Sequence, residues 1–139
     1  MTFDSAKIID LPRFLDARGN LSFGEQLNQV PFALQRVYWL YDVPGGESRG
    51  GHAYKTNQEF IIALSGSFDV VIDNGRQKKN FTLNRSYYGL YIPQGLWREM
   101  HNFSTNSFAL VLSSTQYDSN DYVRNYEEFL KLKANGTLQ

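Results

Sequence analysis

Apolar and polar residues alternate along most of the chain in short runs, and turn-forming residues separate these runs. Alternation with a period of two is typical of strands that bury one face, and many such short runs indicate an antiparallel sandwich or barrel. The segments Asp73-Asn74-Gly75 and Pro44-Gly45-Gly46 agree with this pattern, because their residues favour tight turns. The predicted strands are residues 34–43, 59–66, 67–73, 77–83, 87–93, 96–104 and 107–114.

The C-terminal region alone has the periodicity of a helix. Ser119 or Asn120 is a suitable N-cap, and Gly136 is suited to end the helix. We therefore expect one terminal helix packed on the sheet, within a single domain that spans residues 1–139. The apolar face of this helix would consist of Tyr122, Tyr126, Phe129 and Leu130.

Composition narrows the classes of partner and location. The chain has 14 basic residues (lysine and arginine) and 14 acidic residues (aspartate and glutamate). Its net charge near zero therefore offers no basis for binding nucleic acid or an anionic membrane. The chain has no cysteine, which excludes disulfides, thiolate ligands and a cysteine nucleophile. Residues 1–14 lack the basic start and long apolar segment of a secretion signal, so we expect a cytoplasmic protein.

Two glycine-containing motifs have the spacing of the two cupin motifs. Proteins with these two motifs fold as a small jelly-roll barrel, so the resemblance implies an all-β cupin barrel with one C-terminal helix. The first motif is formed by Gly46, His52, Tyr54, Glu59 and Gly66, and the second by Gly89, Pro93, Gly95, Arg98 and Asn102.

The four ligand positions of metal-binding cupins are altered here. His52 and Glu59 keep a histidine and the glutamate of the ligand set, whereas Tyr54 and Arg98 replace its other two histidines. A guanidinium cannot lose its proton to become a ligand, and its charge repels a cation, so we expect no bound metal. Residues i and i+2 of a strand point to the same face, so His52 and Tyr54 should both point into the mouth of the barrel.

The residues leave several roles open. His52 alone fits either a satisfied polar side chain or a functional imidazole. A buried Arg98 needs an anionic partner. This partner could be either Glu59, in an ion pair, or a bound ligand. Along residues 36–41, Arg36, Tyr38 and Leu40 share one face of a strand, and the pattern does not decide whether this face is inside.

Four segments of the chain resemble the sugar 3,4-ketoisomerases, a family of cupins. They are ALQRVYWLYDV, SRGGHAYK, YYGLYIPQGLWREMHNF and YDSNDYVRNYEEFL, and the resemblance extends from Ile8 to Leu130. It implies a homodimer without metal or redox cofactor that moves the keto group of dTDP-4-keto-6-deoxyglucose from C4 to C3. It further implies a place in making deoxyamino sugars for lipopolysaccharide or S-layer glycans.

The resemblance also implies which residues form the site. The family motif Arg-Gly-x-His-x-His-Lys is matched by Arg49, Gly50, His52 and Lys55, whereas Tyr54 replaces the second histidine. On this basis His52 and Tyr54 are the expected catalytic residues. The expected substrate-binding residues are Arg18, Arg36, Tyr38, Arg49, Lys55, Glu59, Arg98 and His101.

Tyr54 leaves the chemistry with several alternatives. An unperturbed phenol is a poor base at neutral pH but can donate a proton, so His52 could be the base with Tyr54 as the acid. His101 could be the base instead. The chain could also be a cupin that binds a nucleotide sugar or another carbohydrate without converting it, or an isomerase or epimerase of a different nucleotide sugar. Arg18 and Arg98 occupy positions that vary in the family and bear on whether the product has the gluco or the galacto configuration. The combination found here does not decide between these two products.

Overall fold

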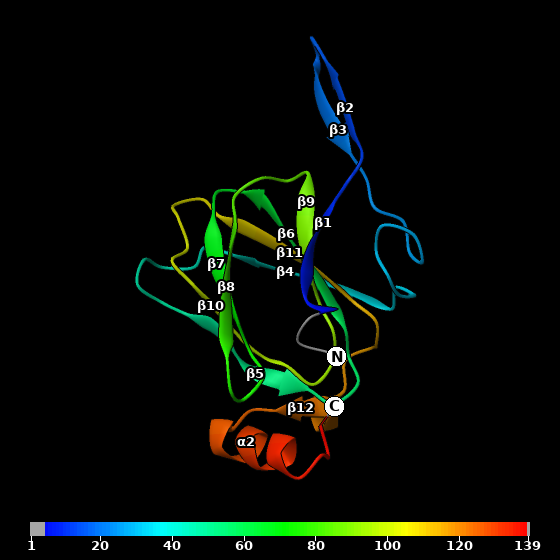
Figure 1. Ribbon diagram of the computed structural model, residues 1–139. Helices are drawn as coiled ribbons and strands as arrows, with labels where there is room; N and C mark the ends of the chain where they lie inside the picture. The colour runs from blue at the N-terminus through cyan, green and yellow to red at the C-terminus, as the bar shows by residue number, and fades with distance from the viewer. Residues whose placement is uncertain (1–4, 139) are drawn as a thin grey trace.

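Two five-stranded antiparallel sheets face each other in the computed structural model, which describes residues 5–138 (Figure 1). The first sheet has the order β1 (Lys7–Asp10), β9 (Tyr88–Ile92), β6 (Glu59–Ser65), β11 (Phe108–Ser113) and β4 (Arg36–Tyr41). The second has the order β12 (Tyr122–Val123), β5 (Arg49–Tyr54), β10 (Trp97–His101), β7 (Phe68–Asp73) and β8 (Lys78–Leu83). Each of the seven predicted strand regions contains a strand, and the all-β expectation is confirmed.

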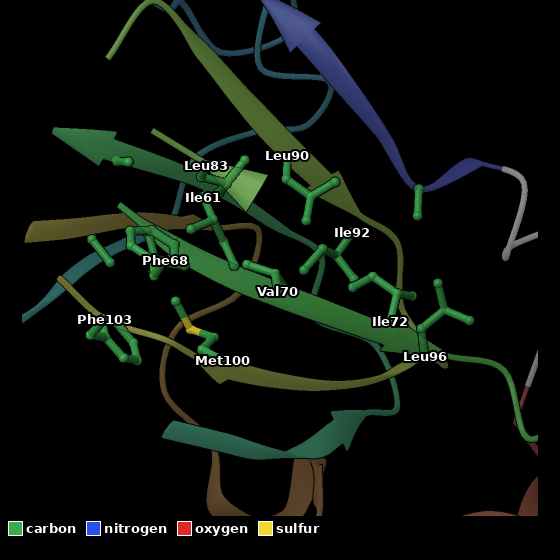
Figure 2. Close-up of a cluster of buried hydrophobic side chains, with 14 residues drawn as sticks. Ile61, Phe68, Val70, Ile72, Leu83, Leu90, Ile92, Leu96, Met100 and Phe103 are labelled. Carbon is green, nitrogen blue, oxygen red and sulfur yellow. The ribbon is translucent and has the colours of Figure 1, made fainter. Parts of the chain in front are cut away.

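The main core lies between the two sheets. Phe68, Val70 and Ile72 alternate along β7 and point inward, where they meet Ile61 and Leu90 of the opposite sheet (Figure 2). Removing these apolar faces from water supplies the principal driving force for closing the two sheets over each other. This packing explains why period-two alternation located the strands so well.

Helix α2 (Tyr126–Ala134) begins later than predicted. Its N-cap is Asn125, whose side chain accepts a hydrogen bond from the backbone of Glu128. Residues 119–121 form a short 3-10 turn, and Tyr122 lies in β12 because its backbone pairs with β5. Gly136 follows the helix with φ of +81°, as expected for the residue that ends it.

The helix packs on the outer side of the second sheet, as predicted. Phe129 is fully buried and packs against Trp97, with the two rings tilted and their centroids 5.6 Å apart. Helix α2 therefore covers the face of β5 and β10 that is turned away from the core (Figure 1). Within residues 5–138, no helix is long and apolar enough to cross a membrane.

A two-stranded hairpin, β2 (Arg13–Asp16) and β3 (Gly19–Ser22), extends away from the barrel (Figure 1). Its apolar side chains are exposed, with Phe14 at 59%, Leu15 at 60% and Leu21 at 58% of their full accessibility. The strand pattern did not predict β1, β2, β3, β5 or β12. The hairpin has no buried face within this chain, so its sequence lacks the alternation that marks the barrel strands.

Candidate active site

A cavity of about 470 Å³ opens between β4, β5, β6 and β10. Its wall combines aromatic rings, arginines and a single imidazole. Most of the site residues predicted from the sequence lie in this wall, which brings together side chains from four strands. These residues are Arg36, Tyr38, Arg49, His52, Tyr54, Glu59 and Arg98.

Three predicted site residues lie elsewhere. Arg18 is at the end of the β2–β3 hairpin, where its guanidinium pairs with Asp16 at 2.8 Å. Lys55 is exposed just beyond β5. His101 is on the face of β10 opposite to Arg98, and its Nε2 lies 3.0 Å from a carboxylate oxygen of Glu99. The alternation of β10 thus separates His101 from the cavity of its own chain.

Strand β4 turns Arg36, Tyr38 and Leu40 towards the cavity. Val37, Trp39 and Tyr41 point outward, and Trp39 retains 51% of its accessibility. The sequence pattern allowed either face to be inside because both carry aromatic residues. The structure selects the face that carries an arginine and a tyrosine suited to a polar ligand.

Two glycines shape the start of β5. Gly50 and Gly51 have φ of +87° and +73°, a region that residues with a Cβ rarely adopt. A Cβ on Gly50 would also lie 3.1 Å from the backbone oxygen of Arg98. The register shifts here, with Arg98 opposite His52 and Glu99 opposite Gly50. After this bulge, His52 and Tyr54 both line the cavity, as their spacing predicted.

A buried ion pair lies deep in the cavity. Arg98 Nη1 donates to Glu59 Oε1 over 2.6 Å, and both side chains are 1% exposed. Tyr38 donates its hydroxyl to the other carboxylate oxygen over 2.5 Å. Burial, and next the charge of Glu59, raise the pKa of Tyr38 well above its usual value. Of the two roles considered for Arg98, the structure contains the ion pair. Each carboxylate oxygen of Glu59 therefore accepts a hydrogen bond.

His52 is the imidazole of the cavity. Its Nε2 atom is buried and has no hydrogen-bond partner among the described residues. Burial, followed by the positive charges of Arg98 and Arg124, lowers the pKa of His52 to about 3, while a backbone hydrogen bond to Gly50 acts in the opposite direction. That bond uses the ring as a donor through its other nitrogen, so Nε2 carries the lone pair. The ring is therefore neutral in the free protein.

Tyr54 is almost fully buried beside this imidazole, at 1% exposure. Its hydroxyl donates to the hydroxyl of Tyr122 over 3.2 Å, and its ring is 4.8 Å from that of His52 between centroids. Burial raises its pKa far above the ordinary phenol value, and the charge of Glu59 and the bond to Tyr122 act in the same direction. Tyr54 is therefore held as a neutral phenol.

Sequence reasoning missed Tyr117, Tyr122 and Arg124, which also line the cavity. Tyr122 lies opposite Tyr54 in the pairing of β12 with β5, and Arg124 lies over its ring at 4.0 Å from the centroid. The prediction had assigned Tyr122 to the helix. The signal that could have found the true start is Asn125 followed by Glu128 three residues later, the spacing of a capped helix N-terminus.

Asp121 holds this segment in place. Its carboxylate accepts hydrogen bonds from the backbone and hydroxyl of Thr56 at 2.8 and 2.9 Å and from the backbone of Asn57 at 3.0 Å. The backbone of Lys55 donates to its carbonyl over 2.9 Å. These bonds tie β12 to the turn after β5, so Tyr122 and Arg124 are fixed at the cavity.

The cavity is locally cationic although the whole chain is neutral. Arg36, Arg49 and Arg124 line it, and within residues 5–138 no carboxylate forms an ion pair with any of them. The Nε of Arg36 is buried without a hydrogen-bond partner among the described residues. A buried guanidinium donor without a partner is costly, so this arrangement suits an anionic ligand.

The donor set of the cavity does not suit a transition metal. In the described part of the chain, no three histidine, cysteine, aspartate or glutamate side chains gather as a metal site. Glu59 is engaged by Arg98 and Tyr38, which leaves His52 without a second ligand nearby. The expectation of a metal-free protein stays a prediction that elemental analysis can test.

Comparison with known proteins agrees with the resemblance seen in the sequence. A curated TDP-4-oxo-6-deoxy-α-D-glucose-3,4-oxoisomerase of Aneurinibacillus thermoaerophilus is 38% identical over 133 residues, which cover 96% of both chains. A solved TDP-quinovose 3,4-ketoisomerase of Campylobacter jejuni is 42% identical, with a TM-score of 0.86 over 91% of this chain and 97% of that one. A 3,4-ketoisomerase of Thermoanaerobacterium thermosaccharolyticum, solved with TDP, is 32% identical, with a TM-score of 0.92 over 96% and 97%.

A more distant likeness bears on the fold alone. The dTDP-4-dehydrorhamnose 3,5-epimerase of Bacillus anthracis is 18% identical, with a TM-score of 0.76 over 88% of this chain and 79% of that one. The family described as FdtA, WxcM-like, C-terminal, matches residues 4–134. This match covers nearly the whole chain and agrees with the curated relative over the same region. The chain therefore belongs to the FdtA family of WxcM-like proteins.

Proposed function

We propose that this chain is an isomerase that moves the keto group between C4 and C3 of a dTDP-4-keto-6-deoxyhexose. The observation that carries the proposal is the neutral His52, whose unpartnered Nε2 is buried in a cavity lined by arginines. Proton removal next to a carbonyl needs a positioned base, and cations favour binding of the diphosphate of a nucleotide sugar. The relatives are named as 3,4-oxoisomerases or 3,4-ketoisomerases of TDP sugars, which carry out this kind of keto-group movement.

His52 is the base in this proposal. The second and third causes of its low pKa are the charges of Arg98 and Arg124. A bound diphosphate would offset the charge of Arg124, so substrate binding raises the pKa of the imidazole and strengthens it as a base. The free protein thus keeps His52 unprotonated, and the substrate itself prepares it to accept the C3 proton.

The diphosphate lies against Arg36, Arg49 and Arg124 in this proposal, because these guanidinium groups have no ion pair within the described residues. Tyr117 is 64% exposed at the mouth, and the guanidinium of Arg36 is 5.8 Å from its ring centroid. An exposed aromatic ring next to the cations is suited to stack on the base of the nucleotide. A ketoisomerase relative has been solved with TDP.

We infer that the protein is a homodimer built around the β2–β3 hairpin. The hairpin exposes Phe14, Leu15 and Leu21, and the outer face of edge strand β4 exposes Trp39 and Tyr41. Apolar patches of this kind mark protein interfaces, and pairing of two copies would cover them. Leu21→Glu should give monomers in light scattering if the hairpin is the interface, whereas a wild-type monomer would contradict the dimer.

The central experiment is incubation of the purified protein with dTDP-4-keto-6-deoxyglucose, followed by NMR of the products. The expected result is a 3-keto sugar and exchange of the substrate's C3 proton with deuterated solvent. A protein that binds thymidine diphosphate in calorimetry but leaves this proton unexchanged would instead be a nucleotide-sugar binding protein. The gluco or galacto configuration at C4 can be assigned from the same spectra. The cytoplasmic location and the glycan that receives the product stay predictions.

A further inference from the structure

Two tyrosine hydroxyls meet beside the proposed base. Tyr54 Oη donates to Tyr122 Oη over 3.2 Å, and the two residues lie directly opposite each other on β5 and β12. Their rings are 4.7 Å apart between centroids, and they lie 4.8 and 5.1 Å from the ring of His52. The imidazole of His52 and the two phenols therefore form one cluster of rings in mutual contact.

The two phenols differ in what their protons can do. The proton of Tyr54 is committed to Tyr122, and burial and the charge of Glu59 hold its pKa far above the ordinary value. Such a phenol is a fixed hydrogen-bond donor and a poor acid. Tyr122 accepts this bond, is only partly buried and lines the cavity. Its own proton is thus left to donate towards a ligand in the cavity.

Tyr122 lies between a hydrogen-bond donor and a cation. Its hydroxyl oxygen accepts from Tyr54, and the guanidinium of Arg124 lies 4.0 Å from its ring centroid. The other titratable rings facing it are His52 and Tyr54 on β5 and Tyr117, whose centroid is 5.9 Å away. Behind Tyr54 lies the ion pair of Arg98 and Glu59, whose charges largely cancel.

We propose that Tyr122, and not Tyr54, is the acid that exchanges a proton with the oxygens of the substrate, and that Tyr54 is a positioning residue that orients and polarises it. The inference rests on the proposed isomerase activity. It revises the sequence-based assignment, in which Tyr54 was the acid and Tyr122 was a residue of the helix. It also explains why a tyrosine can stand where the family has a histidine, since an imidazole N–H is likewise a donor.

The proton transfers balance within the cavity. His52 takes the C3 hydrogen as a proton, the C3–H electron pair forms the C3=C4 bond, and the carbonyl π pair moves to O4. Tyr122 donates its proton to O4, which gives an enediol, a tyrosinate and an imidazolium. The C3=C4 π pair then takes a proton from the imidazolium to form the C4–H bond, the O3–H pair forms the new carbonyl at C3, and the tyrosinate takes the O3 proton. Both side chains return to their starting states, and no co-reactant is consumed.

The test is a double-mutant cycle in the full-length protein, with kcat and KM measured for each variant. Tyr122→Phe should lower kcat by about 10²- to 10⁴-fold with little change in KM, as for loss of a general acid. Tyr54→Phe should lower kcat by about 3- to 10-fold, which corresponds to one hydrogen bond. The double variant should be no slower than Tyr122→Phe, because Tyr54 acts through Tyr122.

Two further variants serve as rescue and control. Tyr54→His keeps a donor for Tyr122 and should retain most of the wild-type kcat. Tyr126→Phe removes a hydroxyl that donates to Asp73 over 2.7 Å on the helix side of the sheet, so it should leave kcat unchanged. Replacement of Tyr122 by a difluorotyrosine keeps the ring but lowers its pKa, so the alkaline limb of the kcat profile should move to lower pH.

Several results would overturn the inference. A Tyr122→Phe variant with kcat within threefold of wild type would do so, as would an alkaline limb that fluorination does not move. Losses that multiply in the double variant would show that Tyr54 acts independently of Tyr122. A wild-type protein without any turnover would overturn the proposed function, and this inference with it. If wild type and Tyr122→Phe are both active, only this inference fails and the proposed function stands.

Discussion

The two histidines of the chain lie on opposite faces of the same pair of strands. His52 on β5 points into the cavity, where its Nε2 is buried without a partner among the described residues. His101 on β10 points to the outer face, where it is 40% exposed and lies 3.0 Å from Glu99. Strands that alternate side chains between a cavity and the outer surface thus give the same residue type two different environments.

The neighbouring carboxylates explain the difference. On the inner face, Glu59 is engaged by Arg98 and Tyr38, so within residues 5–138 no carboxylate of the cavity remains to pair with His52. On the outer face, Glu99 accepts from the indole of Trp97 over 2.8 Å and also contacts His101. An imidazole becomes available as a base when burial keeps it neutral and its potential partners are bound to other groups.

The largest expected effect is on turnover. His52→Asn should lower kcat by about 10²- to 10⁴-fold, because it removes the general base and keeps a polar side chain of similar size. His101→Asn, the matched change on the outer face, should stay within about twofold of wild type. Both are measured by NMR of the products from dTDP-4-keto-6-deoxyglucose. Equal losses in the two variants would contradict the assignment of the base to the cavity.

The two glutamates should differ strongly in stability. Glu59→Gln leaves the charge of Arg98 buried and uncompensated, so we expect the free energy of unfolding to fall by about 3–5 kcal/mol. Glu99→Gln alters an exposed pair and should change it by about 1 kcal/mol or less. Urea denaturation of the two variants makes the comparison. A small effect of Glu59→Gln would mean that water or other groups compensate Arg98.

The pH dependence of stability should also distinguish the two sites. The pKa of His52 is lowered to about 3 in the folded chain, whereas an unfolded imidazole titrates near 6.5. Between these values the unfolded state binds more protons, so the stabilisation is complete above pH 6.5 and is lost as the pH falls towards 3. His52 should contribute a loss of about 2 kcal/mol between pH 7 and pH 5.

The measurement is urea denaturation at pH 7, 6 and 5 in wild type and His52→Asn. The variant should show a flatter decline of stability with falling pH, since it lacks the imidazole that must be kept neutral. His101→Asn serves as the control and should keep the steeper wild-type decline. Parallel curves for wild type and His52→Asn would argue against the lowered pKa.

The smallest expected effect is that of metal removal. His52 has no second ligand of suitable chemistry at the neighbouring motif positions, because these hold Tyr54 and Arg98. EDTA should therefore leave both the Tm and the turnover unchanged, and elemental analysis should find far less than one transition metal per chain. Finding one zinc, iron or manganese per chain that disappears in His52→Ala would reverse this expectation.

The extent of prediction differed between the two ends of the chain. From residue 34 onward, strands with one buried face carry a clear alternation, and the motif spacing located His52 and Tyr54 correctly in the cavity. The hairpin of β2 and β3 lacks a buried face within the chain, so the same rule did not detect it. Tyr122 was misplaced because its distance from Tyr126 also fits a helical face, although Asn125 marks the true start of the helix.

The sequence by itself determined most of the barrel strands, the shared orientation of His52 and Tyr54 and the presence of a cation at Arg98, because these follow from local periodicity and residue chemistry. The tertiary structure decided which partners the buried groups have. Arg98 and Glu59 are 39 residues apart, and Tyr54 and Tyr122 are 68 residues apart. Such contacts depend on how distant strands are aligned across a sheet, and the pairing of β12 with β5 leaves no signal in the spacing of neighbouring residues.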